Sequence, residues 1–168
     1  MFELIRPDTQ FDFVGKMKAA VIASVAFILI GIASVVFHGG LNLGVDFAEV
    51  TPKRLARALA GRRGVLKSAL LDQHVVAGLG NLCVDEVLWG AGRDPRRTVD
   101  SLDEPEVDRL ASTIRRRLPI MLARGGSTTG VLSPAVRAAC PPCERDGAPL
   151  ERLVIGGRTT VWCPRHQR

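Results

Sequence analysis

The sequence predicts a mainly α-helical protein of 168 residues that ends in a small β-hairpin. Three observations support this fold class. Residues 19–37 form an uninterrupted apolar run, and residues 70–89 contain two apolar helical segments around the turn Gly78-Leu79-Gly80-Asn81. Near the C-terminus, two pairs of metal-binding residue types flank two short alternating segments. We therefore expect a transmembrane helix, a helical bundle and a metal-stabilised hairpin, in that order.

The first fifty residues contain the candidate membrane span. The run from Ala19 to Phe37 carries no charge, and at 1.5 Å per residue it is about 28 Å long, enough to cross a bilayer core. A buried soluble helix is one alternative, but no other segment is apolar enough to enclose it. A cleavable signal peptide is another, but no clear small-x-small site follows. Arg6, Lys16 and Lys18 precede the span, which predicts a cytoplasmic N-terminus.

Residues 1–48 resemble the start of SecF, a membrane subunit of the bacterial protein-export machinery. The resemblance rests on FDFVGKMK at 11–18, on the apolar helix, and on GLNLGVDF at 40–47. It implies that the residues after the span begin an extracytoplasmic domain. That family continues with a small residue and two glycines, whereas Ala48 is followed here by Glu49 and Val50. Further spans of such a subunit do not follow, so transport activity is not expected of this segment alone.

From Glu49 onward the sequence predicts a soluble helical unit. Thr51 and Pro52 are typical of an N-cap and a first helical turn. Helical patterns are expected over residues 52–60, 65–76, 81–90 and 104–124, and a loop over 125–130. Along the last helix, the spacing predicts that one face enters the core through Val107, Leu110, Ile114, Leu118 and Met121.

The glycine turn before the third of these helices is a candidate anion site. Gly78 and Gly80 permit a tight turn, and Asn81 is expected to cap the helix, whose free N–H groups attract anions. An ordinary helix hairpin with a glycine turn is the alternative. Residues 51–168 hold 20 basic and 12 acidic side chains, which favours a polyanionic partner. The absence of tyrosine argues against a stacking platform for single strands.

The last thirty residues contain the strongest metal pattern. Two short pairs, Cys140-Pro-Pro-Cys143 and Cys163-Pro-Arg-His166, flank an expected β-hairpin that turns at Gly156-Gly157. The hairpin would bring the pairs together around one tetrahedral zinc ion, with Cys140, Cys143, Cys163 and His166 as ligands. Two disulfides are the alternative, but three cysteines would leave one unpaired. Cys83 lies in an apolar helix and is expected to be a core thiol.

Residues 51–167 resemble the C-terminal part of the formamidopyrimidine-DNA glycosylase/endonuclease VIII family of base-excision repair enzymes. The resemblance is carried by Lys67, Leu70-Leu71-Asp72-Gln73, Ala77-Gly78-Leu79-Gly80-Asn81, Asp85-Glu86, Gly125-Gly126-Ser127, the cysteine pairs and Gly156-Gly157-Arg158-Thr159-Thr160. It implies a helix-two-turns-helix domain over 49–130 and a zinc-finger hairpin over 135–168. Both would grip the phosphate backbone of damaged or abasic double-stranded DNA, with Lys67, Asn81 and Arg158 as phosphate contacts.

The resemblance does not reach the catalytic half of that family. Those enzymes use an N-terminal proline as nucleophile and a neighbouring glutamate for proton transfer. Here Met1 is followed by Phe2, Pro7 is internal, and Glu3 matches the family's glutamate only in ordinal position. No catalytic residue is therefore expected. His166 replaces a cysteine of the family's zinc site, which is a conservative change for zinc.

Three functions are consistent with these patterns. The preferred one is damaged-DNA binding by a monomer with one structural zinc and no catalytic site. The second is an active DNA glycosylase/AP lyase, as the resemblance implies. The third is a membrane-tethered, export-related protein that carries the zinc module. The first places the chain in the cytoplasm and the third in the inner membrane through residues 19–37, so we expect a chimeric junction near residues 47–51.

Overall fold

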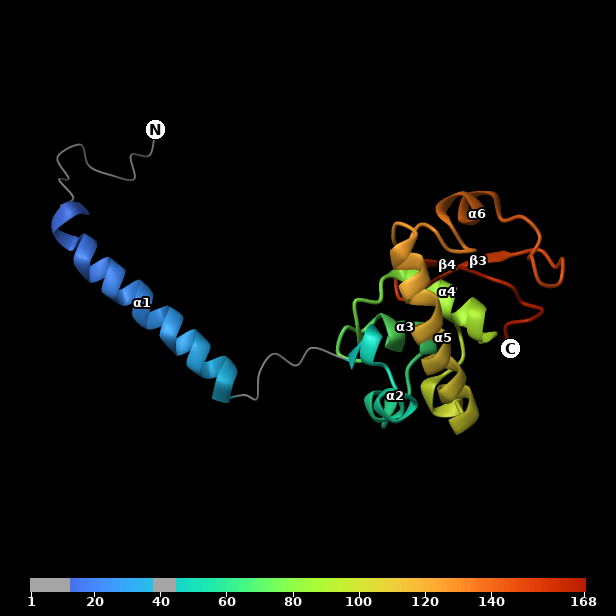
Figure 1. Cartoon of the computed structure of the whole chain (residues 1–168), viewed down its shortest axis with the longest axis horizontal. Coiled ribbons are helices and arrows are strands. Elements are labelled where there is room, and N and C mark those ends of the chain that lie inside the picture. Colours follow the sequence, from blue (N-terminus) through green and yellow to red (C-terminus); the bar gives the residue numbers. More distant parts are fainter. Residues whose placement is uncertain (1–12, 38–44) are drawn as a thin grey trace, which may run out of the picture. The chain divides into compact units, whose positions relative to one another are not determined.

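The computed structural model describes residues 13–37 and 45–168 (Figure 1). The chain divides into two compact units, Met1–Asn42 and Leu43–Arg168. In the first unit, helix α1 spans Phe13–Phe37. An 18-residue stretch of it, Met17–Ser34, has a mean hydropathy of 2.1 and is not buried against other described residues. The length and composition of α1 are those of a candidate membrane span. Most of the SecF-like GLNLGVDF motif lies outside the described residues.

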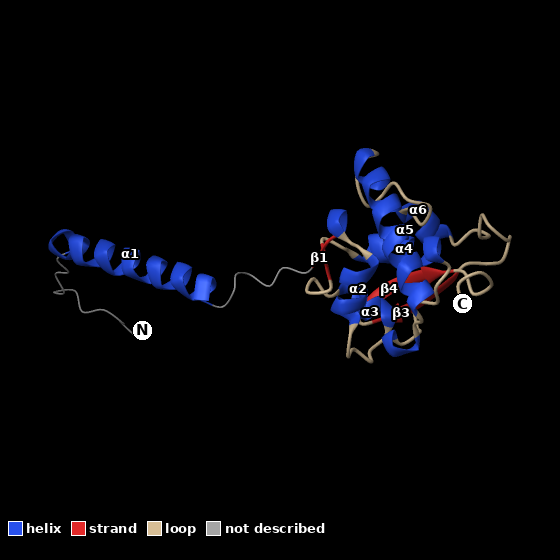
Figure 2. Ribbon diagram, turned by 60° about the horizontal axis from the view of Figure 1, so that its bottom comes forward, coloured by secondary structure: helices blue, strands red, loops and turns tan. Residues whose placement is uncertain are grey.

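The described part of the second unit contains five α-helices, two short 3-10 helices and four strands that pair in twos. In chain order they are β1 (Val45–Asp46), the 3-10 helix η1 (Phe47–Glu49), α2 (Pro52–Leu59), α3 (Leu66–Leu71), β2 (Val76–Ala77), α4 (Asn81–Ala91), η2 (Val99–Ser101), α5 (Glu104–Ala123), α6 (Pro134–Ala139), β3 (Glu151–Ile155) and β4 (Arg158–Trp162). Helix α4 lies at the centre, in contact with α3, α5 and β4 (Figure 2). Helices α3 and α5 and the C-terminal hairpin therefore pack on the same helix.

Local sequence signals set most of the helix boundaries. Thr51 caps α2 by accepting the Arg54 N–H at 3.2 Å, as the sequence predicts. Asp103 and Glu106 form a reciprocal capping box at the start of α5, in which each side chain accepts the other residue's backbone N–H. Gly92 ends α4 in the left-handed conformation, φ 68°. Such positions favour glycine because it has no Cβ to clash.

The helix expected over residues 65–76 is shorter than predicted. It begins at Leu66 and ends at Leu71, where Asp72 accepts the backbone N–H of His74 on its Oδ1 at 2.9 Å. Such an Asx turn offers the backbone an alternative to further helical bonds. The chain then becomes extended, and Val76 pairs with Val45 in the parallel β1–β2 ladder. This pairing joins residues 45–46 to the second unit, before the predicted boundary at residue 48.

Two hydrophobic clusters stabilise the second unit. The larger one lies between α2, α3, α4 and α5 and contains Leu110, Ile114, Leu118 and Met121 of α5, as the helical spacing predicts. The smaller one lies under the hairpin and contains Trp89, Leu132, Cys143, Leu150, Val161 and Cys163. Because Trp89 belongs to α4, the same helix contributes to both clusters. The hairpin is thus packed directly on the central helix.

The C-terminal strands form the predicted hairpin. β3 and β4 are antiparallel, with Glu151 opposite Trp162 and Ile155 opposite Arg158. Gly156 and Gly157 form the turn with φ of 55° and 72°, values that glycine adopts without strain. Helix α6, which the sequence patterns did not indicate, begins with Ser133 accepting the Val136 N–H.

Candidate nucleic-acid interface and metal centre

The turn before α4 is held by one glutamine. Gln73 accepts the Gly78 N–H on Oε1 at 2.8 Å and donates from Nε2 to the Leu79 carbonyl at 3.1 Å. Gly78 has φ 81°, and a Cβ there would lie 3.5 Å from the Phe47 ring. The expected cap by Asn81 is wrong: Gly80 is the N-cap, without a side-chain bond, and Asn81 is the first helical residue. Its side chain is therefore directed elsewhere.

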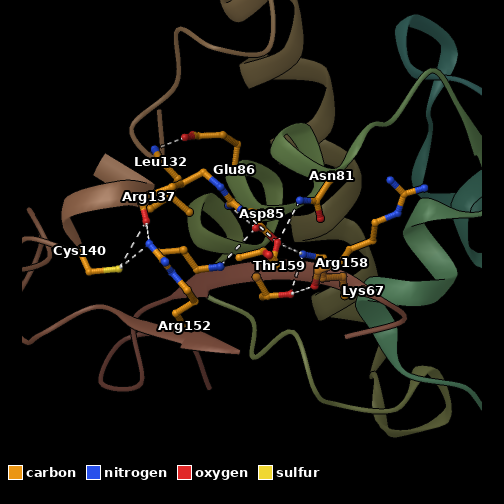
Figure 3. A network of polar contacts seen from close by, with 12 residues as sticks. Lys67, Asn81, Asp85, Glu86, Leu132, Arg137, Cys140, Arg152, Arg158 and Thr159 are labelled. Carbon is orange, nitrogen blue, oxygen red and sulfur yellow. Dashed lines mark hydrogen bonds and ion pairs between the residues drawn. The ribbon is translucent and has the colours of Figure 1, made fainter. Parts of the chain in front are cut away.

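The Asn81 side chain reaches the C-terminal hairpin. Its Nδ2 donates to the backbone carbonyl of Thr159 at 2.9 Å. The same carbonyl accepts from Arg137 Nη2 at 2.6 Å and from Lys67 Nζ at 3.3 Å (Figure 3). Three side chains, from α3, α4 and α6, therefore converge on one main-chain oxygen of β4. This shared oxygen fixes the start of β4 against the start of α4.

Beneath this oxygen lies a buried ionic network. Lys67 Nζ donates to Asp85 Oδ1 at 2.6 Å and to Thr160 Oγ1 at 2.7 Å, and Arg137 pairs with the other oxygen of Asp85. The side chains of Lys67 and Asp85 are 0% exposed. Burial lowers the pKa of Lys67 from its ordinary value, and the neighbouring Asp85 carboxylate opposes that shift. The network joins α3, α4, α6 and β4 in the protein interior.

The three residues expected to contact phosphates occupy two environments. Asn81 is half-buried and bonded to the Thr159 carbonyl, and Arg158, the residue before Thr159, is exposed. Figure 3 shows the Arg158 guanidinium directed away from Asp85, and within residues 45–168 it has no ion-pair partner. Lys67 instead lies inside the protein with its ammonium group occupied by Asp85 and Thr160. A direct phosphate contact by Lys67 would require it to leave that pair.

A second buried carboxylate fixes the loop after α5. Glu86 accepts Arg117 Nη2 at 3.0 Å and the backbone N–H of Leu132 on its other oxygen. Burial raises the pKa of Glu86, while the Leu132 N–H and Arg117 act in the opposite direction. The sequence patterns did not indicate that Asp85, Glu86, Arg137 and Thr160 hold this region together. For Asp85 and Glu86, the signal that could have found them is the occurrence of two successive acids inside an otherwise apolar helix.

The metal-binding residue types gather at the open end of the hairpin. Ligand atoms of Cys143, Asp146, Cys163 and His166 all lie within 4.8 Å of one another. Cys143 Sγ is 3.4 Å from His166 Nδ1, and Cys163 Sγ is 3.4 Å from Asp146 Oδ2. Two sulfurs, an imidazole nitrogen and a carboxylate oxygen form a donor set that zinc accepts. The chemistry of the cluster therefore fits the expected ion.

Cys140, the fourth expected zinc ligand, is not among the residues that the structure brings together here. Cys140 lies outside this group: its Sγ is 3.6 Å from the Arg137 carbonyl and 3.8 Å from Arg152 Nη2. It occupies the end of α6 in the left-handed conformation, φ 44°, whereas Asp146 stands with the other three residues. Cys83 is half-buried against the main core, and burial raises the pKa of its thiol.

Comparison with known proteins places these features in a family. Residues 43–133 match the family model described as "Formamidopyrimidine-DNA glycosylase H2TH domain". The chain is 37% identical over 129 residues to a formamidopyrimidine-DNA glycosylase from Streptococcus mutans, covering 69% of this chain and 47% of that protein. It is 44% identical over 111 residues to the enzyme of the same name from Moorella thermoacetica, covering 66% and 38% respectively. The chain thus spans about half the length of these relatives or less.

Solved structures agree with the sequence matches. The Lactococcus lactis Fpg in complex with abasic-site DNA is 28% identical, with a TM-score of 0.66, over 76% of this chain and 52% of that one. A mutant of the same protein with a Fapy-dG containing DNA gives the same TM-score, identity and coverage. The described helices and hairpin therefore share the architecture of about half of those chains.

Proposed function

The chain belongs to the formamidopyrimidine-DNA glycosylase H2TH domain family, and on that premise we propose that residues 45–168 bind damaged or abasic double-stranded DNA through its phosphate backbone. Similar solved proteins are complexes with abasic and Fapy-dG DNA, which supports this partner. The observation that carries the proposal is the hydrogen bond from Asn81 to the carbonyl of Thr159, the residue that follows the exposed Arg158 at the start of β4. It brings a helix N-terminus, an amide and a guanidinium together, and all three are suitable phosphate ligands.

The proposed contacts come from both predicted domains. Asn81 belongs to the helix-two-turns-helix domain, 49–130, and Arg158 to the zinc-finger domain, 135–168. Lys67 acts in this proposal by holding Thr159 and Thr160 of the hairpin beside α4. Its ammonium group is fully buried. Lys67 would therefore affect DNA binding only by setting the position of Arg158.

The test is the salt dependence of binding to a duplex that contains an abasic-site analogue, measured by fluorescence anisotropy. Each phosphate contact contributes about 0.9 to the slope of log K against log salt. We expect Arg158→Ala to weaken binding and to reduce that slope by about one unit. The matched control is Arg115→Ala, which removes an exposed guanidinium from the middle of α5 and should leave the slope unchanged.

Lys67→Met separates the two roles of a buried lysine. A positioning role predicts weaker binding with the slope of the parent protein, because no phosphate contact is removed. A slope reduced as much as in Arg158→Ala would instead assign Lys67 a direct contact. If Asn81→Ala and Arg158→Ala both bind with the parent affinity and slope, the proposed interface is refuted.

The proposal assigns binding and no catalytic residue. The lysines of residues 45–168 are Lys53 and Lys67; Lys53 lies on α2, and Lys67 is buried in its ion pair. Neither offers an accessible, activated amine beside Asn81 and Arg158. We expect no covalent adduct when the chain and abasic DNA are treated with borohydride; a trapped adduct would favour glycosylase/AP lyase activity, the alternative assignment.

A structural zinc ion belongs to the same proposal. Bound at the open end of the hairpin, it would tie the two ends of β3–β4 together and contribute to folding. One zinc per chain, measured by mass spectrometry of the purified protein, is the expected result. Metal removal should release the hairpin and weaken DNA binding, with the fluorescence of Trp89 and Trp162 as the structural readout.

Helix α1 favours a second candidate function, membrane tethering. It is long and apolar enough to cross a bilayer, and the SecF-like resemblance of residues 1–48 supports that use. Retention of the expressed chain in the membrane fraction after alkaline carbonate washing would support tethering, and release would refute it.

Reading single DNA molecules across codons 40–60 tests the proposed junction near residues 47–51, because a misassembled chimera would not be found as one continuous reading frame.

A further inference from the structure

One exposed side chain, Gln73, uses its whole amide group to hold the turn before α4. Its Oε1 accepts the Gly78 N–H at 2.8 Å. Its Nε2 donates to the Leu79 carbonyl at 3.1 Å and to the Leu71 carbonyl at 3.2 Å. An amide nitrogen offers two donors, and both are used here. The three bonds tie the end of α3 to the residues that lead into α4.

The turn itself restricts its own conformation only weakly. Leu79 is buried in the main core, but the residues on either side of it, Gly78 and Gly80, are exposed glycines. Gly78 has φ 81°, and glycine adopts many other backbone angles as readily. The buried Leu79 side chain therefore fixes the position of the turn, and the orientation of its peptide groups needs a further restraint. The amide of Gln73 supplies that restraint.

The orientation of these peptide groups decides where the start of α4 is directed. In a trans peptide, the C=O and the following N–H point in opposite directions, so a bond from Gln73 to the Leu79 carbonyl also sets the plane of the Leu79–Gly80 peptide. The Gly80 carbonyl then accepts the Val84 N–H at 3.0 Å. The N–H groups of residues 81–83 consequently have no acceptor within the helix, and no side chain caps the N-cap residue Gly80.

We propose that Gln73 is a positioning residue of the DNA interface: by fixing the turn, it directs the first N–H groups of α4 and the Asn81 side chain towards one DNA phosphate. The inference rests on the DNA binding proposed above and names the residue that prepares the α4 part of that interface. Gln73 makes no phosphate contact of its own, because both of its donors are used by main-chain carbonyls. Donors that are already oriented need no ordering when DNA binds, so the loss of Gln73 lowers affinity.

The test is a thermodynamic cycle between a protein change and a DNA change. The protein change is Gln73→Met, which keeps the length of the side chain and removes its amide. The DNA change replaces single phosphates around an abasic-site analogue by neutral methylphosphonates, and fluorescence anisotropy measures the affinity. We expect Gln73→Met to weaken binding to the unmodified duplex by about tenfold, as for the loss of one hydrogen bond to a charged group. The salt slope should equal that of the parent protein, since no cation is removed.

The coupling between the two changes is a readout that a merely structural role would not move. Asn81→Ala identifies the phosphate concerned, as the position where a methylphosphonate weakens the parent protein but has little further effect on that variant. At this position, we expect little further effect on Gln73→Met as well; at the other positions its effect should equal that on the parent.

Two further variants complete the design. Ser112→Ala is the matched control: it also loses a side-chain bond to the main chain, from Ser112 Oγ to the Arg109 carbonyl at 2.9 Å, but on α5, and should keep the parent affinity and coupling. Gly78→Ala distorts the turn while Gln73 stays in place, because the new Cβ would be strained at φ 81° and would lie 3.5 Å from the Phe47 ring. It should reproduce the lost coupling.

Parent affinity in Gln73→Met, or a full methylphosphonate effect on it at the position that Asn81→Ala identifies, would overturn the inference. Urea unfolding followed by tryptophan fluorescence shows whether Gln73→Met is folded; if it is not, Gly78→Ala decides, and a full methylphosphonate effect on that variant would equally overturn it. A parent protein that does not bind the duplex, or that responds to no methylphosphonate coupled to Asn81, would refute the proposed DNA interface itself. That outcome is distinct from a failure of the role of Gln73 alone.

Discussion

Removal of the Asp85 carboxylate is the sharpest test of how the hairpin is held. Asp85 is 0% exposed and pairs with both Lys67 and Arg137. Asp85→Ala leaves these two cations buried without a counter-charge, and breaking a buried pair in this way costs about 3–5 kcal/mol of unfolding free energy. Because burial already lowers the pKa of Lys67, part of that penalty would be met by loss of its proton.

The partner substitution should be milder. Lys67→Met keeps a side chain of similar length and leaves Asp85 paired with Arg137, so about 1–3 kcal/mol is expected from the lost hydrogen bonds. In the double variant, Lys67→Met removes one of the two unpaired cations that Asp85→Ala creates. The double variant should therefore be more stable than the sum of the single changes predicts, with a coupling of about 1–3 kcal/mol.

Urea unfolding followed by tryptophan fluorescence measures these differences. Both tryptophans, Trp89 and Trp162, are buried in the second unit, so their emission reports on the region concerned. Glu49→Ala is the matched control, since it removes a carboxylate from a pair whose side chains are more than half exposed and should change stability by about 1 kcal/mol or less. If Asp85→Ala is no more destabilising than Lys67→Met, or if the two changes are additive, Asp85 is not the shared counter-charge of the two cations.

Two further predictions concern helix packing and acid stability. Gly90→Ala places a Cβ 2.7 Å from Arg117 Cδ and 2.9 Å from Thr113 Cγ2, so urea unfolding should show a loss of about 1–3 kcal/mol; Gly64→Ala, which meets nothing within 4 Å, should not share it. Burial alone would raise the pKa of Glu106. Hydrogen bonds from Arg97 and the Asp103 N–H, together with the charges of Arg93 and Arg97, outweigh burial and lower the pKa of Glu106. The unfolded chain then binds the proton more tightly, so stability present above about pH 4.3 is lost as pH falls further. Glu106→Gln should flatten that part of the pH profile, and a parallel loss in both proteins would contradict the assignment.

Local chemistry explains which elements the sequence could predict. Thr51 and Pro52 encode the start of α2, and Gly156-Gly157 encodes the hairpin turn, because these signals act over a few residues. The end of α3 was misjudged since its apolar pattern continues to Val76. There the Asx turn at Asp72 and the pairing of Val76 with Val45 override the helical pattern. Tertiary pairing of this kind has no signal within the segment itself.

The site was predictable only in part, for a related reason. Asn81 and Arg158 belong to recognisable motifs, but the Thr159 carbonyl that Asn81 holds is also bonded by Arg137, which lies on a six-residue helix without a marked pattern. The candidate metal site shows the same limit, because Asp146, which lies with Cys143, Cys163 and His166 in the structure, has a residue type common in loops.

The oxygen that Lys67, Asn81 and Arg137 share belongs to the main chain of Thr159. Any amino acid at position 159 supplies the same carbonyl, so an alanine scan would score this position as neutral. Substitutions should therefore be tolerated at Thr159 but not at Lys67, Asn81 and Arg137, whose side chains donate to its carbonyl. The placement of the hairpin is determined by residues 67, 81 and 137, on three separate helices, and not by the residue that they hold.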